Sequence, residues 1–132
     1  MDTFEILSQL CSAAGVSGAE VSAAETAAKL LEEYGEVTLD NALGSVICKV
    51  GSWEDGKSVM LLDAHIDEIG MIVTYITEDG FLKISGCGGL DTRLLLAQQV
   101  TVYGKEKLTG IVTSTPPHLE KDSSCLLYTS PS

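Results

Sequence analysis

The chain has 132 residues, 45% of them hydrophobic, which is enough for a modest core. Its 19 Asp and Glu outnumber 8 Lys and Arg, and the formal net charge of −11 predicts repulsion from nucleic acid and from anionic membranes. We therefore expect neither as a partner. Four scattered cysteines without a C-x-x-C pair, no signal-peptide pattern and no long apolar span favour a cytoplasmic protein with free thiols.

Two helices are predicted within residues 2–34. Asp2 and Glu5 form a capping-box pattern that is followed by apolar residues at helical spacing. Ser17 and Glu20 form a second such pattern, which predicts a helix through about Leu31. We interpret both helices as scaffold.

From Glu36 onward the pattern changes to strands. Short strands are predicted over residues 37–39 and 45–50, joined by a turn. Residues 58–64 form a continuous apolar run, which is typical of a strand buried on both faces of a sheet with helices packed on it. Helices followed by strands of this kind predict a layered α/β domain.

After Glu68 the predicted strands become short and closely spaced, which favours a small β-barrel or sandwich. A domain boundary is therefore expected near residues 67–70, and domain junctions are common places for sites. The predicted strands cover residues 69–76, 81–85, 99–103 and 108–114.

The candidate site lies at the end of the apolar run. His65 and Asp67 are two residues apart, so on a strand they point to the same face. This suits an imidazole that binds a metal through one nitrogen while a carboxylate holds the N–H of the other. The alternative for His65 is a polar residue that ends a strand. Glu68 alternates to the opposite face, and we interpret both Asp63 and Glu68 as structural or solvated.

Three further features carry weaker predictions. His118 follows two prolines, so we interpret it as a linker or interface histidine rather than a ligand. Asp91 and Arg93 can pair with each other or with a partner subunit. Residues 120–132 lack the alternation of the preceding strands, which predicts a tail that does not pack and is disordered or foreign.

Four motifs in this order and spacing resemble the N-terminal part of the tetrahedral-dodecamer (TET-type) two-metal aminopeptidases, also labelled glutamyl or deblocking aminopeptidases. The resemblance covers about residues 2–119. The motifs are Gly15-Val16-Ser17-Gly18, Asp40-Asn41-Ala42-Leu43-Gly44-Ser45-Val46, Asp63-Ala64-His65-Ile66-Asp67-Glu68-Ile69-Gly70 and Ser114-Thr115-Pro116-Pro117-His118-Leu119.

The resemblance implies an α/β catalytic domain interrupted by a small PDZ-like β-barrel domain that mediates subunit contacts. Residues 1–68 would begin the catalytic domain, residues 69–119 would form the insertion, and residues 120–132 would be the tail. His65 matches the first metal ligand of the family, and Asp67 matches the catalytic carboxylate that orients it.

The resemblance also implies two divalent metal ions per subunit, zinc or cobalt, peptide substrates and self-association into a homo-oligomer, a dodecamer when complete. The other ligands and the general base of the family lie further along the chain than this sequence extends. We therefore expect an incomplete fragment that is inactive alone.

The sequence is compatible with three functional hypotheses. The leading hypothesis is a metal-dependent aminopeptidase that uses a metal-activated water. The alternative is a non-catalytic β-rich assembly module, and the two differ in whether the source gene continues past Lys121 into further ligands. Carbohydrate hydrolysis requires two suitably separated carboxylates, and the sequence singles out no such pair.

Overall fold

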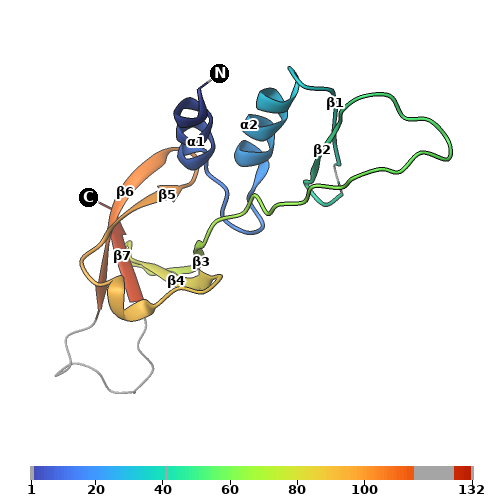
Figure 1. Ribbon diagram of the computed structural model, residues 1–132. Coiled ribbons are helices and arrows are strands. Elements are labelled where there is room, and N and C mark those ends of the chain that lie inside the picture. The colour runs from blue at the N-terminus through green and yellow to red at the C-terminus, as the bar shows by residue number, and fades with distance from the viewer. Residues whose placement is uncertain (1, 41, 115–126, 132) are drawn as a thin grey trace. The chain divides into compact units, whose positions relative to one another are not determined.

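The computed structural model describes residues 2–40, 42–114 and 127–131. His118, interpreted above as a linker or interface histidine, lies outside these ranges. The chain divides into two compact units, Met1–Glu68 and Ile69–Ser132 (Figure 1).

The N-terminal unit begins with helices α1 (Thr3–Ser12) and α2 (Val21–Leu31). The Asp2 N–H donates to Glu5 at 3.4 Å, as the first capping box predicts. The second capping box does not form, because α2 starts later and its N-cap position is Glu20. Within the described ranges, no helix is long and apolar enough to cross a bilayer. The core of this unit comes from one face of α2, with Ala23, Ala24, Ala28 and Leu30 buried.

A two-stranded antiparallel hairpin follows the helices and packs beside α2 (Figure 1). It consists of β1 (Glu36–Leu39) and β2 (Val46–Lys49), close to the predicted strands. Gly35 makes the close connection between α2 and β1. A Cβ at this position would lie 2.9 Å from the carbonyl carbon of Lys49, so the approach requires glycine.

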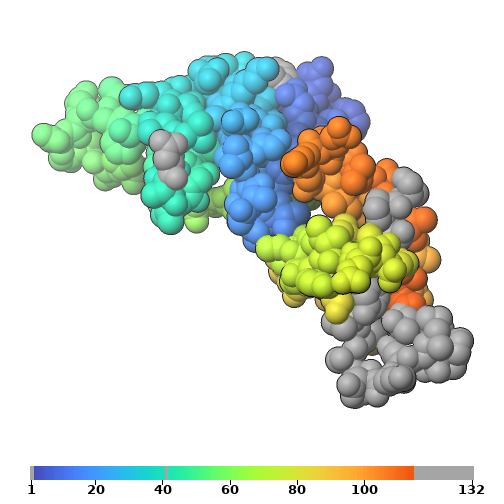
Figure 2. Space-filling model, turned by 180° about the vertical axis from the view of Figure 1, so that it is seen from behind, coloured from blue at the N-terminus to red at the C-terminus, as the bar shows by residue number. Residues whose placement is uncertain are grey.

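The predicted buried strand at residues 58–64 is wrong. This segment forms no strand, and Met60, Leu61 and Leu62 are 85–86% exposed. It follows β2 in a long loop, seen as the green trace in Figure 1 and the green projection in Figure 2. A strand that is apolar on both faces needs paired neighbours and covering helices, and the described residues supply neither around this segment.

The C-terminal unit is a single antiparallel sheet of five strands in the order β3-β4-β7-β6-β5. Four of the strands confirm the predicted short strands. Leu82 and Val112 are buried, and Val112 is only 1% exposed. A short 3-10 helix, η1 (Thr92–Leu94), precedes β5. The strands are β3 (Gly70–Ile76), β4 (Leu82–Cys87), β5 (Gln99–Tyr103), β6 (Lys107–Ser114) and β7 (Leu127–Pro131).

The fifth strand differs from the prediction of an unpacked tail at residues 120–132. β7 pairs with β6 over Ser114↔Leu127 to Gly110↔Pro131, and with β4 at Leu82↔Thr129 and Lys83↔Tyr128. Main-chain hydrogen bonds suffice for such pairing, because the edges of β4 and β6 offer free donors and acceptors to any extended segment. Alternation of side chains was therefore the wrong criterion for this segment. Residues 120–126 and 132 lie outside the described ranges.

Asp91 and Arg93 form a local pair, which is one of the two arrangements that the sequence left open. The Arg93 guanidinium donates through Nε to Asp91 Oδ1 at 2.9 Å and through Nη2 to Oδ2 at 2.7 Å. This fork of donors, with the Arg93 backbone N–H, lowers the pKa of Asp91 from its ordinary value.

Candidate functional site

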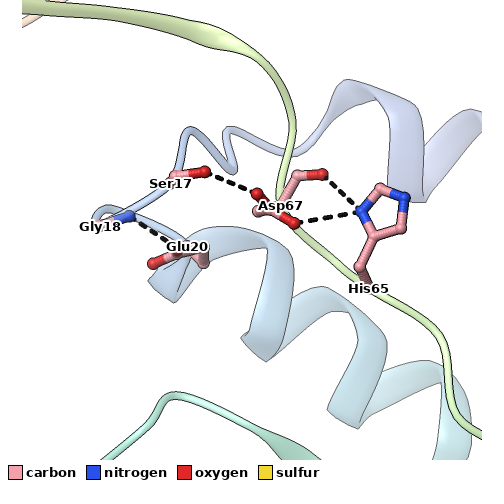
Figure 3. Close-up of polar contacts among 5 residues, drawn as sticks. All are labelled: Ser17, Gly18, Glu20, His65 and Asp67. Carbon is pink, nitrogen blue, oxygen red and sulfur yellow. Dashed lines mark hydrogen bonds and ion pairs between the residues drawn. The ribbon is translucent and has the colours of Figure 1, made fainter. Parts of the chain in front are cut away.

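The candidate site lies within the N-terminal unit, where the loop after β2 returns to the connection between α1 and α2. His65 is exposed, and its Nδ1 lies 3.1 Å from both the backbone carbonyl oxygen and Oδ1 of Asp67 (Figure 3). A carbonyl and an ionised carboxylate can only accept, so Nδ1 carries the proton and donates to them. The Nε2 lone pair of the neutral imidazole is then left for another partner.

The second oxygen of the Asp67 carboxylate is held from the opposite side. The Ser17 hydroxyl donates to Asp67 Oδ2 at 2.6 Å, so Asp67 lies between Ser17 and His65 (Figure 3). The hydrogen bond from Ser17, followed by the one from His65, lowers the pKa of Asp67 from its ordinary value. The carboxyl group therefore remains an ionised acceptor for both partners.

Two backbone segments far apart in sequence are joined next to these side chains. The Glu68 N–H donates to the Gly15 carbonyl at 2.8 Å, and the Gly15 N–H donates to Glu68 Oε1 at 3.1 Å. A parallel bridge pairs Val16 with Glu68. We call this set of contacts the Gly15–Glu68 bridge. It gives Glu68 a structural role, which is one of the two interpretations that the sequence left open.

Gly15 is buried in this bridge. A Cβ added there would lie 3.0 Å from the Cβ of Ala23 and 3.3 Å from the carbonyl oxygen of Ile66. The loop before α2 can therefore approach the segment that carries His65 only because residue 15 has no side chain.

A hollow of about 290 Å³ opens beside His65 within the same unit. The hollow is lined mainly by apolar residues with a few polar groups, as ligand sites commonly are. Its lining consists of Leu10, Cys11, Ala13, Gly15, Ala23, His65, Ile66 and Glu68.

The polar groups of the candidate site fit a single ligand of a metal ion and do not make a complete metal site. His65 offers a single nitrogen whose opposite N–H is already held, as is usual for metal-binding histidines. Over residues 2–40, 42–114 and 127–131, no group of three or more His, Cys, Asp or Glu is placed to hold an ion. Metal ions in proteins generally need three or four protein ligands, so the described residues supply at most a part of such a centre.

The contact between His65 and Asp67 was predicted from the sequence, but the hydrogen bond of Ser17 to Asp67 was not. The hydroxyl of Ser17 was assigned to the start of a helix, whereas it bonds to a residue 50 positions away. The available signal was the motif Gly15-Val16-Ser17-Gly18, because its position in a loop leaves the Ser17 side chain able to bond outside the helix.

Comparison with known proteins identifies the family. The family model described as M42 glutamyl aminopeptidase matches residues 44–125. The chain belongs to this family. The resemblance drawn from the four motifs is thereby confirmed, and the family is one of peptide hydrolases.

Two curated relatives illustrate the extent of the match. The putative aminopeptidase FrvX of Escherichia coli is 36% identical over 117 residues, which cover 86% of this chain and 32% of that protein. The lysyl aminopeptidase of Pyrococcus furiosus is 27% identical over 125 residues, which cover 93% of this chain and 35% of that protein. This M42 chain therefore spans about a third of the length of the curated relatives it matches.

Solved structures agree with the family assignment. The TET aminopeptidase from a marine sediment Thaumarchaeota archaeon superposes with a TM-score of 0.81 and 29% identity, covering 96% of this chain and 37% of that one. The PhTET1-12s dodecamer superposes with a TM-score of 0.76 and 27% identity, covering 100% and 46%. The small mixed α/β structure of this M42 chain is thus that of part of a TET aminopeptidase.

Proposed function

We propose that this chain is part of a metal-dependent aminopeptidase that removes N-terminal residues from peptides, with His65 as a metal ligand and Asp67 as the carboxylate that orients it. The supporting observation is the His65 Nδ1, which faces two acceptors at 3.1 Å and leaves Nε2 free to bind, in a chain of the M42 aminopeptidase family.

The residues of this chain prepare the ligand. Asp67 holds the Nδ1–H of His65, so the imidazole keeps the tautomer with a lone pair on Nε2. The Gly15–Glu68 bridge fixes the backbone that carries both residues. Two divalent ions, zinc or cobalt, would activate a water molecule and polarise the scissile carbonyl when bound.

We propose that the remaining ligands and the general base belong to sequence outside this chain. Two observations support this proposal: the described residues contain no three-residue ligand set, and the relatives are about three times as long. The 132-residue chain should then bind zinc or cobalt loosely and hydrolyse no peptide.

The C-terminal unit suggests a role in assembly. We propose that residues 69–119 belong to a PDZ-like β domain inserted in the catalytic domain, and that the protein forms a homo-oligomer, a dodecamer when complete. The support is the likeness to PhTET1-12s, described as a dodecamer, and to the Pyrococcus horikoshii TET1 peptidase, described as assembling into a tetrahedron or an octahedral shell. A cytoplasmic location is proposed from the scattered cysteines.

The test uses the protein extended to the full length of its relatives. His65→Ala should remove one bound ion, measured by elemental mass spectrometry, and nearly all hydrolysis of a dipeptide substrate. Asp67→Asn should cost about 10–100-fold in metal affinity or activity, because the amide no longer fixes the tautomer. His118→Ala replaces the other histidine of the chain and serves as the matched control.

Two results would contradict the proposal. If His65→Ala kept two ions per subunit and the parental rate, His65 would not be a ligand. If the extended protein assembled but bound no ion and hydrolysed no peptide, it would instead be the non-catalytic assembly module.

A further inference from the structure

The loop between α1 and α2 offers a hydroxyl that the helix does not use. Ser17 lies three residues before Glu20, the N-cap position of α2, and the Gly18 N–H donates to Glu20 Oε1 at 2.7 Å. The Ser17 hydroxyl is therefore free of a capping role, and it donates to Asp67 Oδ2 at 2.6 Å instead.

The backbone around Ser17 is held on both sides. The Ala19 N–H donates to the Val16 carbonyl at 2.8 Å and closes a turn around Ser17 and Gly18. Immediately before this turn, the Gly15–Glu68 bridge ties the loop to the residue that follows Asp67. The turn and the Gly15–Glu68 bridge thus hold Ser17 close to Asp67 without using the side chains of these two residues.

The Asp67 carboxylate needs such a second partner. Its side chain is 44% exposed and that of His65 is 86% exposed, so water competes for both. With Oδ2 anchored by Ser17, rotation of the carboxylate away from His65 would break a short charge-assisted hydrogen bond. Oδ1 is thereby kept on the His65 Nδ1–H.

We propose that Ser17 is a positioning residue: through Asp67 it fixes His65 in the Nδ1–H tautomer and so presents Nε2 as a metal ligand. This proposal rests on the proposed function for its purpose. The tautomer itself is a property of the metal-free chain and can be measured whether or not His65 binds an ion.

The experiment measures the His65 tautomer in the ¹⁵N-labelled 132-residue chain by long-range ¹H–¹⁵N NMR, at about pH 8.5, where an ordinary histidine is neutral. His118→Ala assigns the His65 signals. The wild-type chain should show mainly the Nδ1–H form. Ser17→Ala should lower the ratio of the Nδ1–H to the Nε2–H form about fivefold, the effect of losing one typical hydrogen bond.

Three variants make the result specific. Ser17→Thr keeps the hydroxyl and should keep the wild-type ratio. Ser8→Ala, at an exposed position of α1, is the matched control and should also leave it unchanged. If Ser17→Ala does not fold, Ser17→Cys supplies the comparison, because a thiol is a weak donor of similar size.

The proposal is overturned if the folded Ser17→Ala or Ser17→Cys chain keeps the wild-type tautomer ratio, or if Ser17→Thr changes it as much as alanine does. Failure of the proposed function would look different. His65→Ala of the extended protein would keep its full metal content, while Ser17→Ala of the 132-residue chain would still change the tautomer ratio.

Discussion

Two adjoining stretches of the N-terminal unit are held in opposite ways. Residues 59–62 are apolar and largely exposed, with 61% of Val59 and 86% of Leu62 accessible to solvent. A few residues later, the segment from His65 to Glu68 is polar and tied to the loop before α2 by hydrogen bonds of 2.6–3.1 Å. The apolar stretch has the composition of a core and lacks one, whereas the polar stretch is fixed without much burial.

The difference indicates that the arrangement around His65 is set by a few hydrogen bonds close to it in space, some of them long-range in sequence. It depends on Gly15, Ser17 and Glu68, and not on burial of the strand-like run that precedes it. The His65 side chain can therefore be oriented by nearby hydrogen bonds while the surrounding hydrophobic packing is incomplete. Two substitutions test this comparison directly, and a third tests a local ion pair in the C-terminal unit.

The largest effect is expected from Gly15→Ala. The new Cβ would press on the Cβ of Ala23 and on the Ile66 carbonyl oxygen, so the Gly15–Glu68 bridge should open. Overpacking of this kind costs about 1–3 kcal/mol, and the free energy of unfolding should fall by that amount in urea titrations followed by circular dichroism. Gly89→Ala is the control, because an added Cβ there meets nothing within 4 Å. Equal stability of the two variants would show that the bridge does not hold the segment.

A smaller effect is expected in the apolar stretch. Leu61→Gln should change the free energy of unfolding by no more than about 0.5 kcal/mol, because the side chain is 85% exposed. It should also reduce self-association in light scattering by breaking an exposed apolar patch. Leu30→Gln makes the same change at a buried position of α2 and should cost about 2–4 kcal/mol. A comparable loss from Leu61→Gln would mean that the stretch packs in solution.

The smallest effect concerns a carboxylate of the C-terminal unit that is also set by a local partner. Arg93→Gln removes the guanidinium that lowers the pKa of Asp91, so this pKa should rise toward its ordinary value in a ¹³C NMR titration. Because the folded-state pKa is the lower one, the stabilisation from the pair is complete above about pH 4 and is lost as the pH falls through the folded-state pKa. Lys105→Gln removes one positive charge elsewhere in the unit and should leave the pKa of Asp91 unchanged.

The sequence predicted the elements whose signals are local. The helices of residues 2–34, the β1–β2 hairpin and the short strands from β3 to β6 follow from periodicity and turn residues. The strand predicted at residues 58–64 failed because a strand needs neighbours, and composition does not reveal whether they are present. β7 was missed because pairing through the main chain leaves little mark on side-chain order.

The candidate site was predicted in the same uneven way. His65 and Asp67 are two residues apart, so their pairing could be inferred from strand geometry, although the segment is not a strand. Ser17 bonds to Asp67 across 50 residues, whereas the sequence pattern assigned its hydroxyl to the start of a helix. Long-range hydrogen bonds of a loop residue cannot be derived from one sequence, because every nearby acceptor competes for the same donor.

The Gly15–Glu68 bridge also has a kinetic consequence. It joins residues separated by 53 positions, and the whole of α2 and the β1–β2 hairpin lies inside the loop that it closes. Contacts of such high sequence separation form only after the entropy of closing the loop has been offset by the enclosed elements. We therefore expect the contacts that hold the segment carrying His65 to form late in the folding of the N-terminal unit. We expect protection of the Glu68 amide, which donates to Gly15, from hydrogen exchange to mark their completion.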